Sequence, residues 1–369
     1  MNKIYQDIKT LTQELIVFQS TADKPHHLNN VVDFCAQFFE ESGLFIRRYE
    51  HNNVPSIVVS NKKTKHFNVL LNGHVDVVGA NQSDFVPKIS DGKLYGRGAL
   101  DMKGPVAALM MAMKQHGQNY PDHSIGLMLT SDEEIGGPDG VGYLLEAEEY
   151  TADVVVVPDG GDIDRIVTAQ KGVIRFKLTA KGESAHGSRP WLGKNAIAIM
   201  MGLNGDLVRA FPGPTAEEDW KPSINMGTIS AGTAVNKVPA LCTAGLDMRF
   251  TEEHEVEEWV GIITSICDAR GVEVEIEIIG DMCFTDFNDP YLQLFKKANE
   301  LILGREVRFG VEAGASDARY FSSRGMPVII SNPVGDNIHN GGEYIELESL
   351  YQYYEVLSKF LLDCHSVEN

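Results

Sequence analysis

The stretch FNVLLNGHVDVV, residues 67–78, decides how the rest of the sequence is interpreted. Its first part is mostly apolar, which predicts a short buried strand, and Asn72-Gly73 is a pair that ends strands. His74 and Asp76 follow. Alternate residues of an extended chain point the same way, so the imidazole and the carboxylate share one side of a strand end. Ligand sites of open α/β sheets lie at such ends, although the pair would also fit a polar surface loop.

Acidic residues follow other apolar segments in the same way. Ile125–Leu129 runs into TSDEE, and Val154–Val157 runs into PDGG. A glycine-rich turn, GRGALDMKG at Gly96–Gly104, precedes a helix-forming segment. The acidic residues in these three places include Asp101, Glu133, Glu134 and Asp159. Because strands alternate with amphipathic helices, we predict an α/β domain with a mixed, mostly parallel sheet flanked by helices.

A different order of elements occupies the middle of the chain. From residue 172 the pattern reads strand, helix, strand, strand, helix, strand, which is the ferredoxin-like order of an α+β unit. From Asp289 the first pattern returns. We therefore predict a larger domain made of residues 1–171 and 286–369, with a smaller domain, residues 172–285, inserted into it.

The composition excludes several classes of function. The chain has 369 residues, and its 52 acidic and 32 basic residues leave a net charge of −20, which repels nucleic acids and anionic membranes. The N-terminal residues lack the apolar segment of a signal peptide, and no apolar run reaches the length of a membrane span. The five cysteines are scattered without a C-x-x-C motif, which favours a reducing compartment. We expect a cytoplasmic protein whose partners are neither nucleic acids nor membranes.

The candidate site gathers several carboxylates at one edge of the predicted sheet. In a parallel sheet the loops that follow the strands meet at one edge, and the sequence NPVGDNIHNGG adds His339. Several carboxylates and two imidazoles would then lie together with few basic residues nearby. Like charges so placed either raise one another's pKa or bind a cation. Nitrogen and oxygen donors without a thiolate favour Zn²⁺ at a catalytic site, with Mn²⁺ and Co²⁺ as alternatives.

Five motifs, taken in order, resemble those of one family of enzymes. They are LNGHVDVV, GRGALDMKG, TSDEEIGG, VVPDGG and NIHNGG. Together they resemble the di-zinc metallopeptidases and deacylases, which include aminoacylases, acetylornithine deacetylases, succinyl-diaminopimelate desuccinylases and glutamate-releasing carboxypeptidases. The resemblance covers nearly the whole chain and implies that the inserted domain is a lid. The open edges of the lid's sheet need covering, which favours a homodimer formed through this lid and dimerisation domain.

The resemblance implies two zinc ions per chain and a role for each metal ligand. His74 and Asp159 would bind one zinc, and Glu134 and His339 would bind the other. Asp101 would bridge both ions. Two metals about 3.5–4 Å apart can hold an attacking oxygen and polarise a substrate carbonyl together.

Further roles near the metals also follow from the resemblance. Asp76 would accept the second N–H of His74 and fix its tautomer. Glu133 would be the general base that moves the water proton to the leaving amine. The spacing alone does not distinguish the base from the ligand in the pair Glu133 and Glu134. The family also has a cis peptide after the bridging residue, here Asp101–Met102.

Residues of the lid and of a later loop would contact substrate. His186, in GESAHGSRP, would bind the oxyanion, often in the partner subunit's site, although a loop histidine is also commonly solvated. Arg249 would bind a substrate carboxylate or, equally, form a salt bridge on a strand face. The other implied contacts are Asn236, Gly314, Ser316 and Arg319. The segment GASDARYF, which contains the last three, would also fit a capped helix start.

The resemblance predicts a zinc-dependent amidohydrolase that cleaves the amide bond of an N-acylated amino acid, as acetylornithine deacetylases and succinyl-diaminopimelate desuccinylases do. A dipeptidase or carboxypeptidase with the same site is the alternative. A relative that binds metal or peptide without catalysis is a third, although Glu133 would then have no use. Asp159 and Ala315 stand where strict desuccinylases have glutamate and tend to have threonine, so the acyl group stays open.

Overall fold

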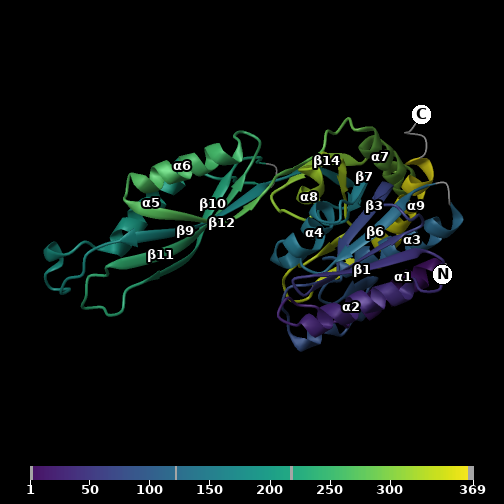
Figure 1. The fold of residues 1–369 in the computed structure, drawn as a ribbon, viewed down its shortest axis with the longest axis horizontal. Helices are drawn as coiled ribbons and strands as arrows, with labels where there is room; N and C mark the ends of the chain where they lie inside the picture. The colour runs from purple at the N-terminus through teal and green to yellow at the C-terminus, as the bar shows by residue number, and fades with distance from the viewer. Residues whose placement is uncertain (1–2, 121–122, 217–218, 365–369) are drawn as a thin grey trace. The chain divides into compact units, whose positions relative to one another are not determined.

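The computed structural model describes residues 3–120, 123–216 and 219–364, and these form two compact units. The first unit comprises the described parts of residues 1–169, 284–310 and 316–369. The second comprises the described parts of residues 170–283, together with residues 311–315. Figure 1 shows the helices and strands of both units.

A nine-stranded sheet forms the centre of the first unit. Its strands are β1 (Phe45–His51), β2 (Val54–Ser60), β3 (His66–His74), β6 (Ile125–Thr130), β7 (Thr151–Val157), β8 (Arg165–Gln170), β13 (Cys283–Phe284), β14 (Arg308–Glu312) and β15 (Val328–Ile330). They follow the order β1-β2-β6-β3-β7-β15-β8-β13, and β14 pairs with β8. β6, β3, β7 and β15 run parallel, whereas β1, β2 and β8 pair antiparallel with their neighbours. The prediction of a mixed, mostly parallel sheet is confirmed.

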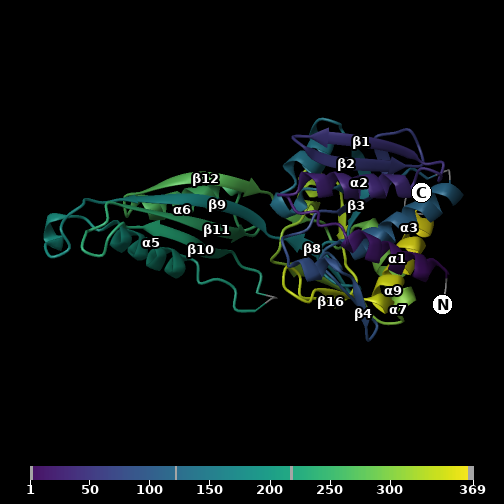
Figure 2. The same cartoon turned by 90° about the horizontal axis from the view of Figure 1, so that it is seen from below.

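The central strands are buried on both faces, which explains their continuous apolar sequences. In β7, Val154 and Val156 belong to the main core, while Val155 and Val157 are buried on the opposite face. Five helices contribute side chains to the same main core as the sheet. Figure 2 shows these helices beside the strands of the first unit. They are α1 (Lys3–Ile16), α2 (Pro25–Phe38), α3 (Lys103–Asn119), α7 (Pro290–Leu303) and α9 (Leu347–Asp363). Two short helices complete the unit, α4 (Tyr143–Glu146) and α8 (Ala318–Ser322).

The parallel strands bring several predicted site residues to one edge of the sheet. β3 ends at His74, which lies opposite Thr130 at the end of β6. β7 ends at Val157, so Asp159 lies two residues beyond its carboxyl end. The alternation of strands and helices in the sequence therefore places the candidate residues together although they are distant along the chain.

A small four-stranded sheet, which the sequence patterns do not predict, carries two further parts of the site. Its strands are β4 (Lys88–Ser90), β5 (Lys93–Tyr95), β16 (Gly335–Asp336) and β17 (Tyr344–Glu346), in the order β16-β17-β5-β4. β5 leads into the turn of Asp101, and the loop between β16 and β17 contains His339. Because β5 and β17 pair directly, the strand that leads into this turn lies beside the strand at which this loop ends.

The second unit has the element order that the sequence predicts. Its elements are β9 (Gly172–Lys181), α5 (Ala196–Ala210), β10 (Ser223–Ala231), β11 (Leu241–Phe250), α6 (Val256–Asp268) and β12 (Val272–Gly280). The strands are antiparallel, in the order β10-β11-β9-β12. Alternate residues of β9 and β11, such as Phe176 and Leu246, are buried in a core shared with α5 and α6, whereas Lys177 is exposed.

The sequence predicts residues 311–315 in the larger domain, but the structure differs at this segment. These residues cluster with the second unit. The backbone N–H of Lys171 donates to the carbonyl of Glu312 across 3.3 Å. The contact joins residues that are far apart in sequence, so a linear pattern does not reveal it.

Among the helices of the described residues, none combines the length and apolar character needed to cross a membrane.

Candidate metal centre

His74 and Asp76 lie at the end of β3, and the side chain of each is 1% exposed. Nδ1 of His74 lies 3.1 Å from the backbone oxygen of Asp76 and 3.4 Å from its Oδ1. With Nδ1 occupied by these acceptors, Nε2 faces Asp101 Oδ1 at 3.0 Å. Oδ2 of Asp76 accepts the backbone N–H of Glu134 at 3.0 Å. Asp76 thus connects the His74 strand to the loop after β6.

Glu133 and Glu134 begin a single 3₁₀ turn, Glu133–Ile135, after β6. They are adjacent, but they approach different histidines. Oε2 of Glu133 lies 3.9 Å from Nε2 of His74, and Oε2 of Glu134 lies 3.1 Å from Nε2 of His339. Their side chains are mostly buried. The turn therefore directs the two carboxylates to two different parts of the site.

Asp101 lies between the two imidazoles. Its Oδ1 is 3.0 Å from Nε2 of His74, and its Oδ2 is 3.0 Å from Nε2 of His339. The turn that carries it packs closely, because a Cβ on Gly104 would lie 2.3 Å from the backbone oxygen of Ala99. The peptide Asp101–Met102 is cis. One carboxylate thus contacts both histidines through different oxygens.

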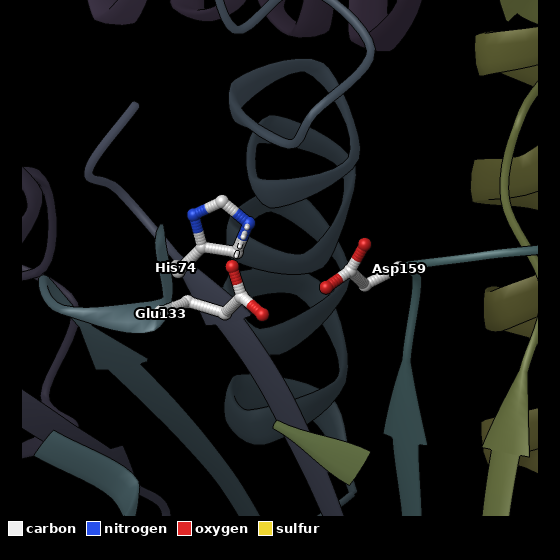
Figure 3. Close-up of side chains that lie close together, drawn as sticks. All are labelled: His74, Glu133 and Asp159. Atoms are coloured by element: carbon white, nitrogen blue, oxygen red, sulfur yellow. Dashed lines mark ion pairs between the residues drawn. The ribbon is translucent and has the colours of Figure 1, made fainter. Parts of the chain in front are cut away.

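Two groups of possible metal ligands result. His74, Glu133 and Asp159 form one, and Asp101, Glu134 and His339 form the other. Within each group the possible ligand atoms lie within 4.8 Å of one another. Figure 3 shows the side chains of the first group pointing toward a common space. Imidazole nitrogens and carboxylate oxygens converging in this way fit a divalent cation such as Zn²⁺.

The electrostatics of the site show an excess of negative charge. Burial raises the pKa of Glu133 well above its usual range, and the nearby Asp159 carboxylate raises it further. Burial and repulsion from Asp101 likewise raise the pKa of Asp159. Hydrogen bonds to two carboxylates raise the pKa of His339 to about 10. A proton on the imidazole offsets part of this charge, and a divalent cation would offset it more fully.

His186 and Asn236 lie together in exposed loops of the second unit. The backbone N–H of Gly187 donates to the carbonyl of Asn236 at 2.7 Å, and His186 forms an isolated β-bridge with Lys237. Nδ1 of His186 lies 2.8 Å from Oγ of Ser188. The loops follow β9 and precede β11, so both residues lie at one end of the sheet.

Arg249 lies at the other end of the same sheet. It pairs with Val173 at the start of β9, whereas Lys181 at the end of β9 is next to the His186 loop. A strand rises about 3.3 Å per residue, so roughly 25 Å of β9 separates these two ends. Nε of Arg249 donates to Oδ1 of Asp247 at 2.8 Å, which matches the salt bridge that the sequence allowed.

The three loop residues predicted to contact substrate are divided between the units. Gly314 belongs to the second unit, and Ser316 and Arg319 belong to the first. Ser316 is buried, and its Oγ accepts the backbone N–H of Ala318 at the start of α8. The guanidinium of Arg319 donates to the carbonyl of Gly136 at 2.5 Å. Arg319 thus contacts the turn that follows the two adjacent glutamates.

Two buried carboxylates near the site were not among the predicted site residues. Oδ2 of Asp132 accepts the backbone N–H groups of Asp139 and Gly140, each at 2.9 Å. Burial raises the pKa of Asp132 to about 6 and that of Asp317 to about 7. Asp132 precedes Glu133 in the sequence, and this position was the one signal that could have identified it.

Comparisons with known proteins identify the family. The family model described as peptidase family M20/M25/M40 matches residues 70–363. A succinyl-diaminopimelate desuccinylase from Shewanella pealeana is 31% identical over 313 residues, which are 79% of this chain and 81% of that protein.

Two solved structures show the same fold across their whole length. The aminopeptidase PepT from Bacillus cereus matches with a TM-score of 0.81 at 20% identity, covering 98% of this chain and 99% of that one. The M20 metallo-carboxypeptidase Sso-CP2 from Sulfolobus solfataricus matches with a TM-score of 0.82 at 17% identity and the same coverage. With the family model matching most of its length, this chain belongs to peptidase family M20/M25/M40 and is a metal-dependent hydrolase.

Proposed function

We propose that this hydrolase is a zinc-dependent amidohydrolase that cleaves the amide bond of an N-acylated amino acid. The observation that supports this most strongly is the Asp101 carboxylate between His74 and His339, with Glu133 beside them. Similarity to a succinyl-diaminopimelate desuccinylase over most of the chain supports the acyl-amino acid class. A dipeptidase or carboxypeptidase with the same metal centre is the alternative.

In this proposal the chain holds two zinc ions, with Co²⁺ or Mn²⁺ as alternative metals. His74 and Asp159 would hold one ion, Glu134 and His339 would hold the other, and Asp101 would contribute to both. The contacts of Asp101 with both imidazoles support this arrangement. When bound, such ions lower the pKa of a water molecule and polarise the substrate carbonyl. An imidazole binds a metal ion in its neutral form, so metal binding at His339 would be coupled to loss of a proton.

We assign the proton transfer to Glu133. Its carboxylate lies near His74 but is not the group that contacts His339. Burial raises its pKa, which makes it a stronger proton acceptor than an exposed glutamate. It would take a proton from the attacking water and deliver it to the leaving amine. Asp76 would hold His74 in the tautomer whose Nε2 faces the metal, since Nδ1 faces the Asp76 oxygens.

The residues proposed to contact substrate differ in how well their surroundings suit that role. Arg249 retains a partly exposed guanidinium that a substrate carboxylate could share with Asp247. Arg319 is already bonded to Gly136, so its contact with substrate would use its remaining N–H groups. The other proposed contacts are Asn236, Gly314 and Ser316.

A panel of substrates tests the proposed function. The zinc-loaded enzyme is assayed with N-succinyl, N-acetyl and N-formyl amino acids and with unmodified dipeptides, and release of the free amino group is measured. We expect turnover of at least one acylated amino acid and little turnover of dipeptides, because the acyl class follows the similarity to desuccinylases. Preference for a substrate with a free α-amino group would instead support the dipeptidase alternative.

We also propose a homodimer in which His186 acts in the partner's site. His186 and Asn236 lie at one end of the second unit's sheet and Arg249 lies at the other, roughly 25 Å away by strand rise. One copy of the unit therefore does not bring all three to a single substrate. The edge strands β10 and β12 have no further strand partner within the described residues, and pairing of edges between two chains would produce a C2 dimer.

Complementation between inactive variants tests this arrangement. His186→Ala and Glu133→Ala homodimers should each be nearly inactive. Their heterodimer has one site with Glu133 from one chain and His186 from the other, so it should recover up to about half of wild-type activity if sites act independently. A matched heterodimer pairs wild type with the double variant, and here both sites lack one residue, so it should stay inactive. If the first heterodimer is inactive and the heterodimer of wild type with the double variant is active, then His186 acts within its own chain.

We place the enzyme in the cytoplasm. All five cysteines lie in the described part of the chain, are buried and form no disulfide there. Reduced, buried cysteines suit a reducing compartment.

A further inference from the structure

Glu343 is a buried carboxylate at the end of the loop that carries His339. Its side chain is 1% exposed. It accepts four hydrogen bonds, and all four donors belong to the turn that leads to Asp101. Oε1 accepts the backbone N–H groups of Leu100 and Asp101 at 2.9 and 3.1 Å, and Oε2 accepts that of Gly98 and Nη1 of Arg97 at 3.0 and 2.6 Å.

Backbone contacts join the same two segments. The N–H of Gly96 donates to the carbonyl of Glu343 at 3.0 Å, and Nη2 of Arg97 donates to the carbonyl of Asn340 at 3.3 Å. Asn340 directly follows His339 in the sequence. The pairing of β5 with β17 fixes the base of both segments. The turn of Asp101 and the loop of His339 are therefore bonded to each other at several points.

The chemistry of the four contacts requires a carboxylate. Two ionised oxygens offer about four acceptor positions and no donor, which matches four N–H groups. An amide in the same place would direct its NH₂ group toward N–H donors and leave buried donors without an acceptor. The negative charge of Glu343 and the number of its acceptor positions both match the N–H donors of the turn that leads to Asp101.

We propose that Glu343 is a positioning residue that fixes the Asp101 carboxylate relative to His339 and thereby sets the affinity for the metal ions. This rests on the proposed function, because it takes Asp101 and His339 to be metal ligands. Those two side chains approach to 3.0 Å and come from the two segments that Glu343 joins. Loss of the carboxylate would release the Asp101 backbone N–H, so the bridging side chain would lose its fixed orientation.

Zinc titration of the metal-free protein by calorimetry tests the proposal. Glu343→Gln should weaken zinc binding by about 10- to 100-fold, the range typical of residues that orient metal ligands. The matched control is Ile345→Val, which removes one buried methylene from the adjoining strand and leaves the carboxylate in place. The control should keep wild-type affinity. The visible spectrum of the Co²⁺-loaded protein should change in Glu343→Gln and not in Ile345→Val.

The outcomes separate this proposal from the proposed function. If wild type binds two zinc ions and Glu343→Gln binds them with unchanged affinity and an unchanged Co²⁺ spectrum, Glu343 has only a structural role. If wild type itself binds fewer than two ions, the proposed function fails first. Should Glu343→Gln not fold, Glu343→Asp is titrated instead, because it keeps the charge but its shorter side chain cannot reach all four N–H donors in the turn. Wild-type affinity in that variant would then overturn the proposal.

Discussion

Glu133→Gln should lower kcat by about 10²- to 10⁴-fold while the metal content stays near that of wild type. The substitution keeps the shape of the side chain and removes the proton acceptor, and loss of a general base has effects of this size. Glu133 approaches His74 only to 3.9 Å, whereas the closer contacts of the two histidines are made by Asp101 and Glu134. Steady-state kinetics and elemental analysis of the same preparation give both quantities.

The neighbouring residue provides the matched control for this experiment. Glu134→Gln makes the same chemical change one position along the chain, at the residue whose carboxylate lies 3.1 Å from His339. It should lose metal as well as activity. If Glu133→Gln loses metal and Glu134→Gln does not, then the roles of the two glutamates are reversed.

Asp101→Ala should weaken both metal sites at once, because one carboxylate contacts both imidazoles through different oxygens. After passage over a desalting column, metal analysis should find little zinc in the variant. Single substitutions of the histidines are the comparison. His74→Ala and His339→Ala should each weaken mainly one ion, since each imidazole belongs to a different group of ligands.

A surface aspartate controls for the loss of charge. Asp7→Ala removes a carboxylate from the exposed side of α1 and should leave the metal content unchanged. The bridging role of Asp101 would be contradicted if Asp101→Ala lost one ion and held the other with unchanged affinity.

The sequence predicted the parts of the molecule that local patterns encode. The apolar run before His74 reads as a buried strand, and so do the segments before Glu133 and Asp159. Parallel pairing then brings the residues that follow them to one edge. The alternation of apolar and polar residues over Val173–Ala180 likewise predicted a half-exposed strand, and β9 shows this alternating burial.

The rest depends on contacts that no local pattern records. Strands β5 and β17 have three residues each, which is too short for a hydrophobic period to appear. The role of Glu343 depends on backbone N–H groups more than 240 residues away, and backbone groups have no sequence signal. The glycine-rich motifs GRGALD and NGGEY contain the oppositely charged Arg97 and Glu343, which form an ion pair. These opposite charges were the one sequence feature that indicated the pairing.

Anomalous scattering from zinc-loaded crystals tests the central claim most directly. The claim is that two ions share the Asp101 carboxylate, with His74 and Asp159 on one side and Glu134 and His339 on the other. Data collected at the zinc absorption edge should show two peaks about 3.5–4 Å apart with Asp101 between them. A single peak, or two peaks of which only one contacts Asp101, would contradict the account.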